Sequence, residues 1–433
     1  MNLPIANYQA RRQRLQAELP EGFVAIVRTG ELSARNSDCD YEFRPNSHFY
    51  YLTGYAEPSA YVLINKTQSI LFNLAKDPEK ELWDGFRHGT QGAIDNFGFD
   101  KAYSLEEMDE QVISLLDGCQ SVWFDFSDEL LQKQVMDWQQ NLAKKVRQGA
   151  KAPAQLNQLA GVLGEMRLIK DTQEIELMEK AAQISVKAHT LAMQNVSPGM
   201  LEYELEAELN YCFMKSGSRT PAYNNIVATG SNACTLHYIE NNAQIQDGDL
   251  ILIDAGCELG FYASDITRTF PANGRFSAPQ AALYNLVLKS QKEAIEAVVV
   301  GAKYTDFHDV AVRVLTQGLV ELGLLQGDLD SLIADKAYRD FYMHNTGHWI
   351  GLDVHDVGAY KLADESRPLL PGMVVTVEPG LYVAKDNMQV DEKWRGIGIR
   401  IEDDVLVTES GPVILTHGLA REIDDIEALM ASK

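Results

Sequence analysis

Paired cysteines, long apolar runs and positive charge are all scarce in this 433-residue sequence. The five cysteines are scattered and odd in number, with no Cys-x-x-Cys spacing, which argues against a disulfide framework or a thiolate zinc site. No apolar run approaches the ~18 residues that suggest a membrane span. The N-terminal stretch also lacks the apolar core of a secretory signal, so we expect a cytoplasmic, reducing location.

The charge balance is strongly negative, with 62 Asp and Glu residues against 38 Lys and Arg residues and a formal net charge of −24. Phosphate groups repel such a surface, so neither a nucleic acid nor an anionic membrane is an expected partner. The simplest explanation of the charge is solubility. Carboxylates that bind metal cations would account for a smaller part, because the formal sum omits the cations.

The length favours two domains. The first, residues 1–168, has strand patterns at Phe23–Val27, Ala60–Ile64 and Ser121–Asp125, which alternate with helical stretches around 105–117 and 127–145. This alternation predicts an α/β fold. The stretch 141–164 is rich in Ala, Gln and Lys, and we place the domain boundary shortly after it, at residue 168.

Residues 169–433 alternate groups of helices with groups of strands, as in an α+β domain. Asp171 with Glu174, and Ser277 with Gln280, have the spacing of helix N-terminal capping residues. Helices are expected from Asp171 to about residue 197, over 201–216, after Ser277 and over 305–322. Strands are expected over 225–228, 250–254, 262–270, 373–378, 381–384, 397–407 and 412–416. The order suggests a duplicated unit, although no residue-level repeat is visible.

A predicted hairpin carries two aspartates. If Leu259–Gly260 is its two-residue turn, Asp254 faces Asp265 across the strands. Opposed side chains have Cβ atoms about 4.5–5.5 Å apart, so two carboxylates there would repel each other unless a cation lies between them. Alternatively, both aspartates end exposed strands, or one is protonated. The apolar residues before Asp254 favour a strand that runs through a core.

Two further carboxylates follow apolar strands. Glu378 ends the strand that begins at Met373, and Glu402 lies on the same strand face as Arg400. Taken alone, Glu402 is explained by an ion pair with Arg400, and Glu378 by an exposed strand end. His348 lies in a glycine-flanked segment, where a single histidine is more often a packing residue than a ligand.

Considered together, these residues predict a metal centre. Asp254, Asp265, Glu378 and Glu402 carry a charge of −4, which two divalent cations would balance, and the neutral imidazole of His348 adds a nitrogen ligand. An oxygen-rich set with one histidine suits Mn²⁺ better than metals that prefer thiolates. Two such ions can activate water and polarise a carbonyl group.

These five residues resemble, in order and local context, the ligands of the pita-bread metallopeptidases. The segments that carry the resemblance are Ile253–Gly256, His344–Gly351 and Thr376–Gly380. The resemblance implies a pita-bread catalytic domain with two metal ions, most simply Mn²⁺. It also implies that Asp254 binds one ion, His348 binds the other, and Asp265 and Glu402 bridge both, whereas Glu378 acts as ligand and base.

The resemblance extends to residues around the predicted ligands. It implies that His237 lies near the scissile bond and that His355 steadies the tetrahedral intermediate. His344 matches a third histidine of the substrate pocket. Arg400 and Tyr382 match groups that hold the ligand carboxylates in place.

The first domain resembles the amino-terminal domain of aminopeptidase P through the segment Phe43–Tyr55. The resemblance implies hydrolysis of the first peptide bond of peptides with proline in second position, which releases the N-terminal amino acid. Trp83 and Arg147 match, more loosely, residues that close the substrate pocket, from a neighbouring subunit in a homo-oligomer. A dimer or a tetramer is therefore expected.

Two alternatives remain open. A prolidase, which cleaves only Xaa-Pro dipeptides, would need a cation for the proline carboxylate, and Arg367 and Arg400 are candidates. The preceding segment Lys361–Ser366 departs from the family pattern, which leaves the role of Arg367 open. A non-catalytic binding module is disfavoured because every predicted ligand is intact. The remaining histidines, expected at the surface or in packing, are His48, His88, His189, His308 and His417.

Overall fold

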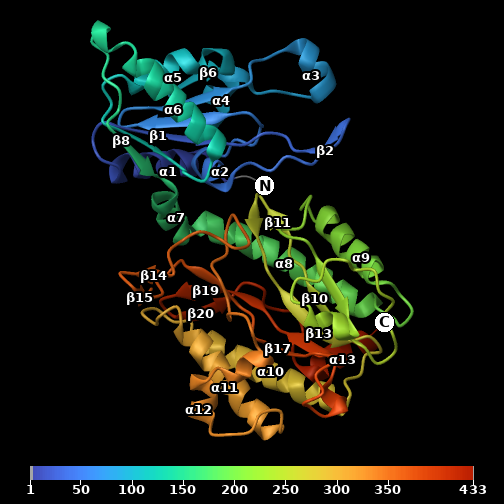
Figure 1. Cartoon of the computed structure of the whole chain (residues 1–433). Coiled ribbons are helices and arrows are strands. Elements are labelled where there is room, and N and C mark those ends of the chain that lie inside the picture. Colours follow the sequence, from blue (N-terminus) through green and yellow to red (C-terminus); the bar gives the residue numbers. More distant parts are fainter. Residues whose placement is uncertain (1–2, 433) are drawn as a thin grey trace. The chain divides into compact units, whose positions relative to one another are not determined.

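The computed structural model describes residues 3–432 and divides between Arg167 and Leu168 into two compact units (Figure 1). This division lies one residue before the predicted boundary. Each unit has its own sheets and helices, which are described separately below. None of the helices formed within residues 3–432 combines the length and the apolar character that crossing a bilayer requires.

The N-terminal unit contains a six-stranded sheet in the order β6-β5-β4-β1-β7-β8. Its strands are β1 (Phe23–Arg28), β4 (Tyr61–Asn65), β5 (Ser69–Asn73), β6 (Lys101–Ser104), β7 (Ser121–Phe124) and β8 (Gln155–Gln158). Strand β1 pairs antiparallel with β4 and parallel with β7, so the sheet is mixed. A short exposed hairpin is formed by β2 (Ala34–Asn36) and β3 (Cys39–Asp40).

Helices cover this sheet, which confirms the predicted α/β fold. The helices of this unit are α1 (Ile5–Glu18), α2 (Ser47–Thr53), α3 (Pro78–Asp84), α4 (Gly89–Phe97), α5 (Met108–Leu116), α6 (Glu129–Ala143) and α7 (Ala160–Leu168). Of these, α3 has no buried residue and α7 ends one residue past the division. Alternate residues of β1, Val24 and Ile26, share an apolar core with Val112 of α5 and Val135 of α6. In Figure 1, α5 and α6 lie above the sheet and α1 and α2 lie below it.

The segment that resembles aminopeptidase P forms α2 and its two ends. The Asn46 side chain caps the helix by accepting a hydrogen bond from the Phe49 backbone N–H at 3.1 Å. Gly54 ends it with a φ of +66°, and a Cβ atom there would lie 2.5 Å from the Tyr8 ring. Every residue of α2 is buried, so this segment belongs to the core of its unit.

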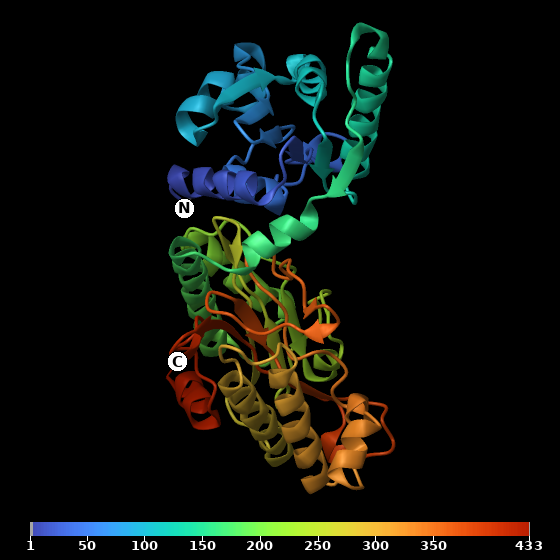
Figure 2. The ribbon, with the colours of Figure 1, turned by 90° about the vertical axis from the view of Figure 1, so that its left-hand side faces the viewer.

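The C-terminal unit begins with two long helices and continues with strands, an order that occurs twice. Its helices are α8 (Thr172–Asn195), α9 (Glu202–Lys215), α10 (Ala278–Glu296), α11 (Asp306–Glu321), α12 (Leu329–Ala334) and α13 (Ile423–Ala431). The capping boxes expected at Asp171 and Ser277 are both formed. Helices α10 and α11 pack side by side (Figure 2).

Each helix pair precedes a three-stranded antiparallel sheet. The first has the order β13-β10-β9 and the second β16-β19-β20, while β17 pairs with β18. These strands are β9 (Ile226–Thr229), β10 (Leu250–Asp254), β13 (Thr267–Pro271), β16 (Val374–Val377), β17 (Gly380–Val383), β18 (Ile397–Arg400), β19 (Asp403–Thr408) and β20 (Gly411–Ile414). Two small hairpins are β11 (Glu258–Leu259) with β12 (Tyr262–Ala263), and β14 (Lys361–Leu362) with β15 (Glu365–Ser366).

Two strands predicted as continuous are interrupted, and each break contains a predicted metal ligand. Residues 264–266 separate β12 from β13, and residues 401–402 separate β18 from β19. In the first break the Asp265 backbone N–H donates to Asp404 Oδ2 at 3.0 Å. In the second, the Glu402 backbone N–H donates to the Thr267 carbonyl at 3.1 Å. At both carboxylates, backbone hydrogen bonds to residues distant in the sequence therefore replace the regular hydrogen bonds between neighbouring strands.

The turn of the acidic hairpin differs from the prediction. Glu258 faces Ala263, so the two central residues are Gly260 and Phe261 rather than Leu259 and Gly260. Their φ angles are +56° and +67°. Two-residue turns with positive φ at both positions match the twist of the flanking strands. Glycine adopts the first position without steric cost, and this selects the observed turn over the predicted one.

The corrected turn changes which residues are opposite each other. Asp254 faces Thr267, so the predicted direct pairing of Asp254 with Asp265 is wrong. Asp265 instead lies beside Gly256, where a Cβ atom would be only 1.8 Å from the Ser264 carbonyl oxygen. Only glycine permits this close approach of the two strands. The aspartates nevertheless meet in space, as described below.

Candidate active site

A cavity of about 510 Å³ lies in the C-terminal unit, and all five predicted ligands contribute to its wall. The predicted pocket residues His237, His344 and His355 also line it, as does Arg400. The remaining lining residues include Tyr223, Leu236, Ile239 and Val354. One end of the cavity is therefore acidic, and its other walls carry imidazole and apolar groups.

The four carboxylates reach this cavity from strand ends and strand breaks. Asp254 is the last residue of β10, and Glu378 directly follows β16. Asp265 and Glu402 occupy the two breaks described above. A side chain at the end of a strand is released from the regular in-and-out alternation, so four carboxylates from different strands can converge.

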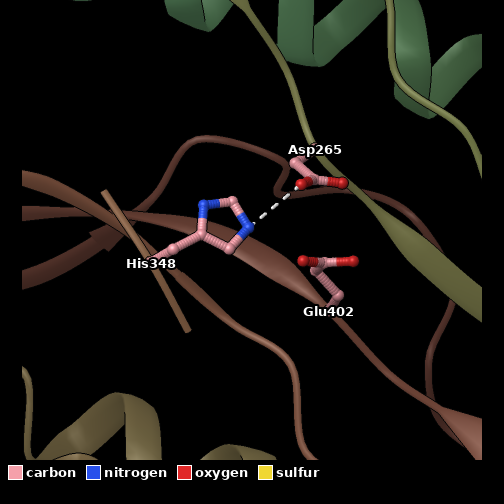
Figure 3. Close-up of side chains that lie close together, drawn as sticks. All are labelled: Asp265, His348 and Glu402. Carbon is pink, nitrogen blue, oxygen red and sulfur yellow. Dashed lines mark ion pairs between the residues drawn. The ribbon is translucent and has the colours of Figure 1, made fainter. Parts of the chain in front are cut away.

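Asp265, His348 and Glu402 form the most compact part of the cluster (Figure 3). One potential ligand atom from each lies within 4.8 Å of the other two. His348 Nε2 is 3.5 Å from Asp265 Oδ2 and 3.6 Å from Glu378 Oε1. Figure 3 shows the imidazole directed toward the two facing carboxylates.

Tyr223 links the two aspartates and was missed by the sequence analysis. Its hydroxyl lies 2.7 Å from Asp254 Oδ1 and 2.5 Å from Asp265 Oδ1. Burial, followed by the negative charge of Asp254, raises the pKa of Tyr223 well above its usual value. The hydroxyl thus stays protonated and bridges the two side chains. It lies in a loop between α9 and β9, where no local pattern marks it.

Asp404 is a second residue that the sequence analysis missed. It is 1% exposed, and its Oδ2 atom accepts the Asp265 backbone hydrogen bond. Burial and the neighbouring Asp265 charge raise the pKa of Asp404 well above its usual value. Asp404 therefore holds the Asp265 backbone in place through this hydrogen bond.

The cluster is electrostatically unfavourable without cations. Asp254, Asp265 and Glu402 are between 2% and 9% exposed, and buried charges are costly unless they are paired. Burial and the charge of Asp265 raise the pKa of Glu402 well above its usual value. Burial likewise raises the pKa of Asp254, although Arg400 opposes the shift.

His348 partly compensates for these carboxylates in the absence of metal. Burial alone would lower its pKa, but Asp265 and Glu378 outweigh burial and raise the pKa to about 9. Burial would raise the pKa of Asp265, but its interaction with His348 lowers it overall. Burial raises the pKa of Glu378 to about 7. The raised pKa values of His348 and Glu378 reflect the excess of negative charge in this cluster.

These features fit a centre of two divalent cations. The donor set of four carboxylates and one imidazole matches hard or borderline metals, and its charge equals that of two such ions. Two cations would replace the protons that the raised pKa values indicate on Glu378 and Glu402. Within residues 3–432, Asp265, His348 and Glu402 are the only group of metal-binding side chains with this compact geometry.

Arg400 and Tyr382 support the acidic cluster from behind. Arg400 Nη2 donates to Asp254 Oδ2 at 2.6 Å, and its Nη1 donates to the Tyr382 hydroxyl at 3.0 Å. His344 Nε2 lies 2.8 Å from the same hydroxyl. Burial and the Arg400 charge lower the pKa of His344 to about 3, so its ring is neutral. Arg400 therefore pairs with Asp254 rather than with Glu402.

His237 and His355 lie on the wall beside the acidic cluster. The ring of His355 is 4.1 Å from that of His348 between centroids. Burial and the nearby His348 lower the pKa of His355, which favours its neutral form. Both histidines come from segments without regular secondary structure, 235–240 and 351–358.

Three other predicted residues are not brought to this cavity within the C-terminal unit. Arg367 is 7% exposed, and its Nη1 donates to the Ala359 carbonyl at 3.2 Å. Trp83 in α3 is 85% exposed, and Arg147 lies in a short 3-10 turn, Val146–Gln148. Both belong to the N-terminal unit, and their function at the pocket stays a prediction.

Comparison with protein families identifies both units. Residues 176–409 match the model of metallopeptidase family M24, and residues 8–123 match that of the aminopeptidase P N-terminal domain. The Xaa-Pro aminopeptidase of Haemophilus influenzae is 45% identical over 99% of this chain and 98% of its own length. That of Escherichia coli is 43% identical over 98% and 97%.

Solved structures agree with the whole architecture. Aminopeptidase PepP of Pseudomonas aeruginosa is 47% identical and superimposes with a TM-score of 0.99, covering 100% of this chain and 99% of that one. Escherichia coli aminopeptidase P, in a zinc-substituted complex with product, is 42% identical with a TM-score of 0.97 and the same coverage. The predicted combination of an α/β amino-terminal domain with a pita-bread catalytic domain is thereby confirmed.

Proposed function

Because this chain belongs to metallopeptidase family M24 and carries the aminopeptidase P N-terminal domain, we propose that it is an Xaa-Pro aminopeptidase. It removes the N-terminal amino acid from peptides whose second residue is proline. The observation that carries the proposal is one cavity in which four carboxylates and His348 meet three further histidines. The full-length likeness to Xaa-Pro aminopeptidases supports the same activity.

Two divalent cations, most suitably Mn²⁺, would be held by Asp254, Asp265, His348, Glu378 and Glu402. When bound, such ions supply Lewis acidity toward the substrate carbonyl and lower the pKa of a bound water. Arg400 orients Asp254 through their 2.6 Å contact, and its charge favours the ionised carboxylate. Tyr223 fixes the spacing of the two aspartates, which supports their function as paired ligands.

Glu378 is the proposed general base. Its carboxylate lies 3.6 Å from His348 Nε2 and 3.7 Å from His344 Nδ1, on the wall of the cavity. In this position its Oε atoms can accept a proton from the attacking water. A general base must lie within hydrogen-bond reach of the proton that it abstracts, and its place on the cavity wall meets that requirement.

His237 and His355 are the proposed donors to the carbonyl oxygen as negative charge develops on it. Both lie on the cavity wall next to the acidic cluster. A neutral imidazole with one N–H can donate there without adding charge. His344 is the proposed third contact of the pocket, with its ring orientation fixed by the Tyr382 hydroxyl.

We place the site in a homo-oligomer, a dimer or tetramer, to which Trp83 and Arg147 contribute. On and beside α3, Leu82, Trp83 and Phe86 are 82%, 85% and 68% exposed, and such a group of exposed apolar side chains supports a contact with another molecule. Light scattering should give the mass of an oligomer. Trp83→Ala should raise KM, whereas Leu130→Ala, at another exposed apolar position, should not.

A cytoplasmic location is also proposed. All five cysteines are free in the structure, in keeping with a reducing compartment. Fractionation of cells that produce the protein should recover its activity with cytoplasmic marker enzymes.

Product analysis with Mn²⁺ and three peptides tests the activity. Xaa-Pro-Yaa should release its first amino acid, whereas Xaa-Ala-Yaa should be cleaved slowly at most. An equal rate on the alanine peptide would contradict the specificity for proline. A clear preference for the dipeptide Xaa-Pro would instead identify a prolidase. Repeating the assay with Zn²⁺ and Mg²⁺ after chelation tests the choice of metal.

A further inference from the structure

One face of α9 carries three polar residues that form hydrogen bonds with a neighbouring segment of the chain. Glu202, Glu206 and Asn210 are spaced four residues apart, and residues at this spacing share a helix face. None of them lines the cavity. Each instead binds a part of the chain between residues 225 and 243, which includes β9 and the loop after it.

Glu202 is the centre of this arrangement. It is fully buried, and both carboxylate oxygens are used. Oε1 accepts from the Thr229 backbone N–H at 2.7 Å and from Asn232 Nδ2 at 3.1 Å. Oε2 accepts from the Tyr238 hydroxyl at 2.8 Å and from the Ala243 backbone N–H at 2.9 Å. Since a carboxylate offers about four lone-pair sites, its hydrogen-bonding capacity is filled.

The next two turns of α9 hold neighbouring points of the same segment. Glu206 Oε2 accepts from Asn241 Nδ2 at 3.0 Å. Asn241 is buried with a φ of +46°, and its Oδ1 accepts from the Val227 backbone N–H at 3.0 Å. Asn210 Oδ1 accepts from Asn225 Nδ2 at 2.9 Å. The helix thereby fixes the segment at its beginning, middle and end.

The held segment carries one side of the substrate cavity. Leu236, His237 and Ile239 all line it, and they flank Tyr238, whose hydroxyl is bound to Glu202. Residues 235–243 form no helix or strand, and an isolated bridge follows at Gln244. Hydrogen bonds from these side chains of α9 therefore hold the loop in place, as backbone hydrogen bonds between strands do in a sheet.

We propose that Glu202 is a positioning residue that acts through His237. Its four hydrogen bonds set the distance of the His237 imidazole from the acidic cluster, so the N–H that donates to the substrate carbonyl is correctly placed before substrate binds. The inference rests on the proposed function of His237. It adds a residue that touches neither metal nor substrate but controls the chemical step.

Glu202→Gln tests this directly. The amide keeps the size of the side chain but turns one oxygen, which receives two hydrogen bonds, into an NH₂ group. A backbone N–H such as that of Ala243 cannot reverse its polarity, so the loop must shift. A displacement of ~1 Å at a reacting group can cost on the order of 10²-fold in rate. We expect kcat to fall by roughly 10- to 100-fold, with KM nearly unchanged.

A double-mutant cycle with His237→Ala separates positioning from a general loss of structure. If Glu202 acts through His237, then Glu202→Gln should change the rate of the His237→Ala enzyme by less than about two-fold, the usual limit of additivity error. An equal loss in both backgrounds would overturn the inference. If His237→Ala alone leaves kcat unchanged, the proposed function of His237 fails first and the inference fails with it.

Matched controls complete the experiment. Glu208→Gln changes a glutamate of the same helix whose Oε2 accepts from Asn195 Nδ2 of α8 at 2.8 Å, away from the held segment, and it should behave as wild type. Metal content should match the wild type in every variant used, and each variant should remain folded at the assay temperature. If Glu202→Gln does not fold, Tyr238→Phe removes a single donor and should give a smaller loss of kcat. The same cycle with His237→Ala then decides the question.

Discussion

Lys170 and Asp356 form a buried ion pair, with Nζ 3.1 Å from Oδ2 and both side chains 1% exposed. Asp356 directly follows His355, one of the two proposed oxyanion donors. The pair therefore joins the segment just before α8 to the loop that carries His355. A Cβ atom on Gly351 would lie 2.2 Å from Asp356 Oδ2, which shows how tightly this loop is packed.

Lys170→Met should strongly destabilise the protein, because it removes a buried cation that lies 3.1 Å from the Asp356 carboxylate. Breaking a buried pair from one side typically costs about 3–5 kcal/mol. The change in unfolding free energy can be measured with urea. A double-mutant cycle with Asp356→Leu gives the coupling energy of the two charges, which should favour folding. A coupling energy near zero would contradict this account of the pair.

Asp265→Ala should abolish activity and remove at least one metal ion. Asp265 has a potential ligand atom within 4.8 Å of those of both His348 and Glu402. Its removal therefore takes away a ligand that is adjacent to both of these residues. Elemental analysis should give two ions per wild-type chain and one or fewer in the variant. Asp335→Ala, at an exposed position of the same unit, is the control. One ion or fewer in fully active wild-type protein would refute the two-metal centre.

His355→Ala should fold and keep its metal, yet lose most of its turnover. The imidazole lies beside the acidic cluster, with its ring 4.1 Å from that of His348. Removing one donor to a developing oxyanion typically lowers kcat by about 10²–10³. Kinetics and elemental analysis on the same preparation check this. A variant that loses metal would show that His355 is a ligand instead.

The metal-free protein should lose stability as pH rises from about 5 to about 9. In the folded state the pKa of Glu378 is raised to about 7 and that of His348 to about 9, so the folded form binds more protons than the unfolded form across this range. Stability must then fall with increasing pH. Metal ions replace these protons, so the rise in melting temperature on adding Mn²⁺ should grow over the same interval.

The Glu378→Gln variant is the control for this pH dependence. It removes the group with a pKa of about 7, so the fall in stability between pH 5 and pH 7 should become shallower. Calorimetry in two buffers with different ionisation enthalpies should also detect protons released when metal binds to the wild type. An unchanged slope in the variant would assign the effect to other groups.

Local patterns predicted most of the helices and strands. Apolar runs marked β1, β10 and β16, and the spacing of Asp171 with Glu174 marked the start of α8, because these signals depend on neighbours in sequence. The breaks at Asp265 and Glu402 could not be predicted in this way. Their backbone groups form hydrogen bonds with Asp404 and Thr267, which are more than a hundred residues distant in the sequence. A local sequence pattern cannot reveal such a contact.

The candidate site shows the same limit. Asp254, Glu378 and Glu402 could be singled out because each follows an apolar strand, and Asp265 because it lies in the same predicted hairpin as Asp254. The pairing of the two aspartates, however, required a turn that the sequence left ambiguous. Tyr223 could not be found from its neighbours, since its importance comes only from reaching two aspartates that lie on other strands. Packing of distant segments decides both points.

The acidic cluster has a consequence for how the enzyme is made. Its members are drawn from positions 254 to 402, and Arg400, which pairs with Asp254, belongs to the last of these segments. Translation delivers the N-terminal unit and the strand ending at Asp254 well before Glu402 leaves the ribosome. A nascent or prematurely terminated chain therefore lacks a complete set of ligands. Peptidase activity therefore arises only after Glu402 has been synthesised, and chains that stop before it cannot cleave the N-termini of other new proteins.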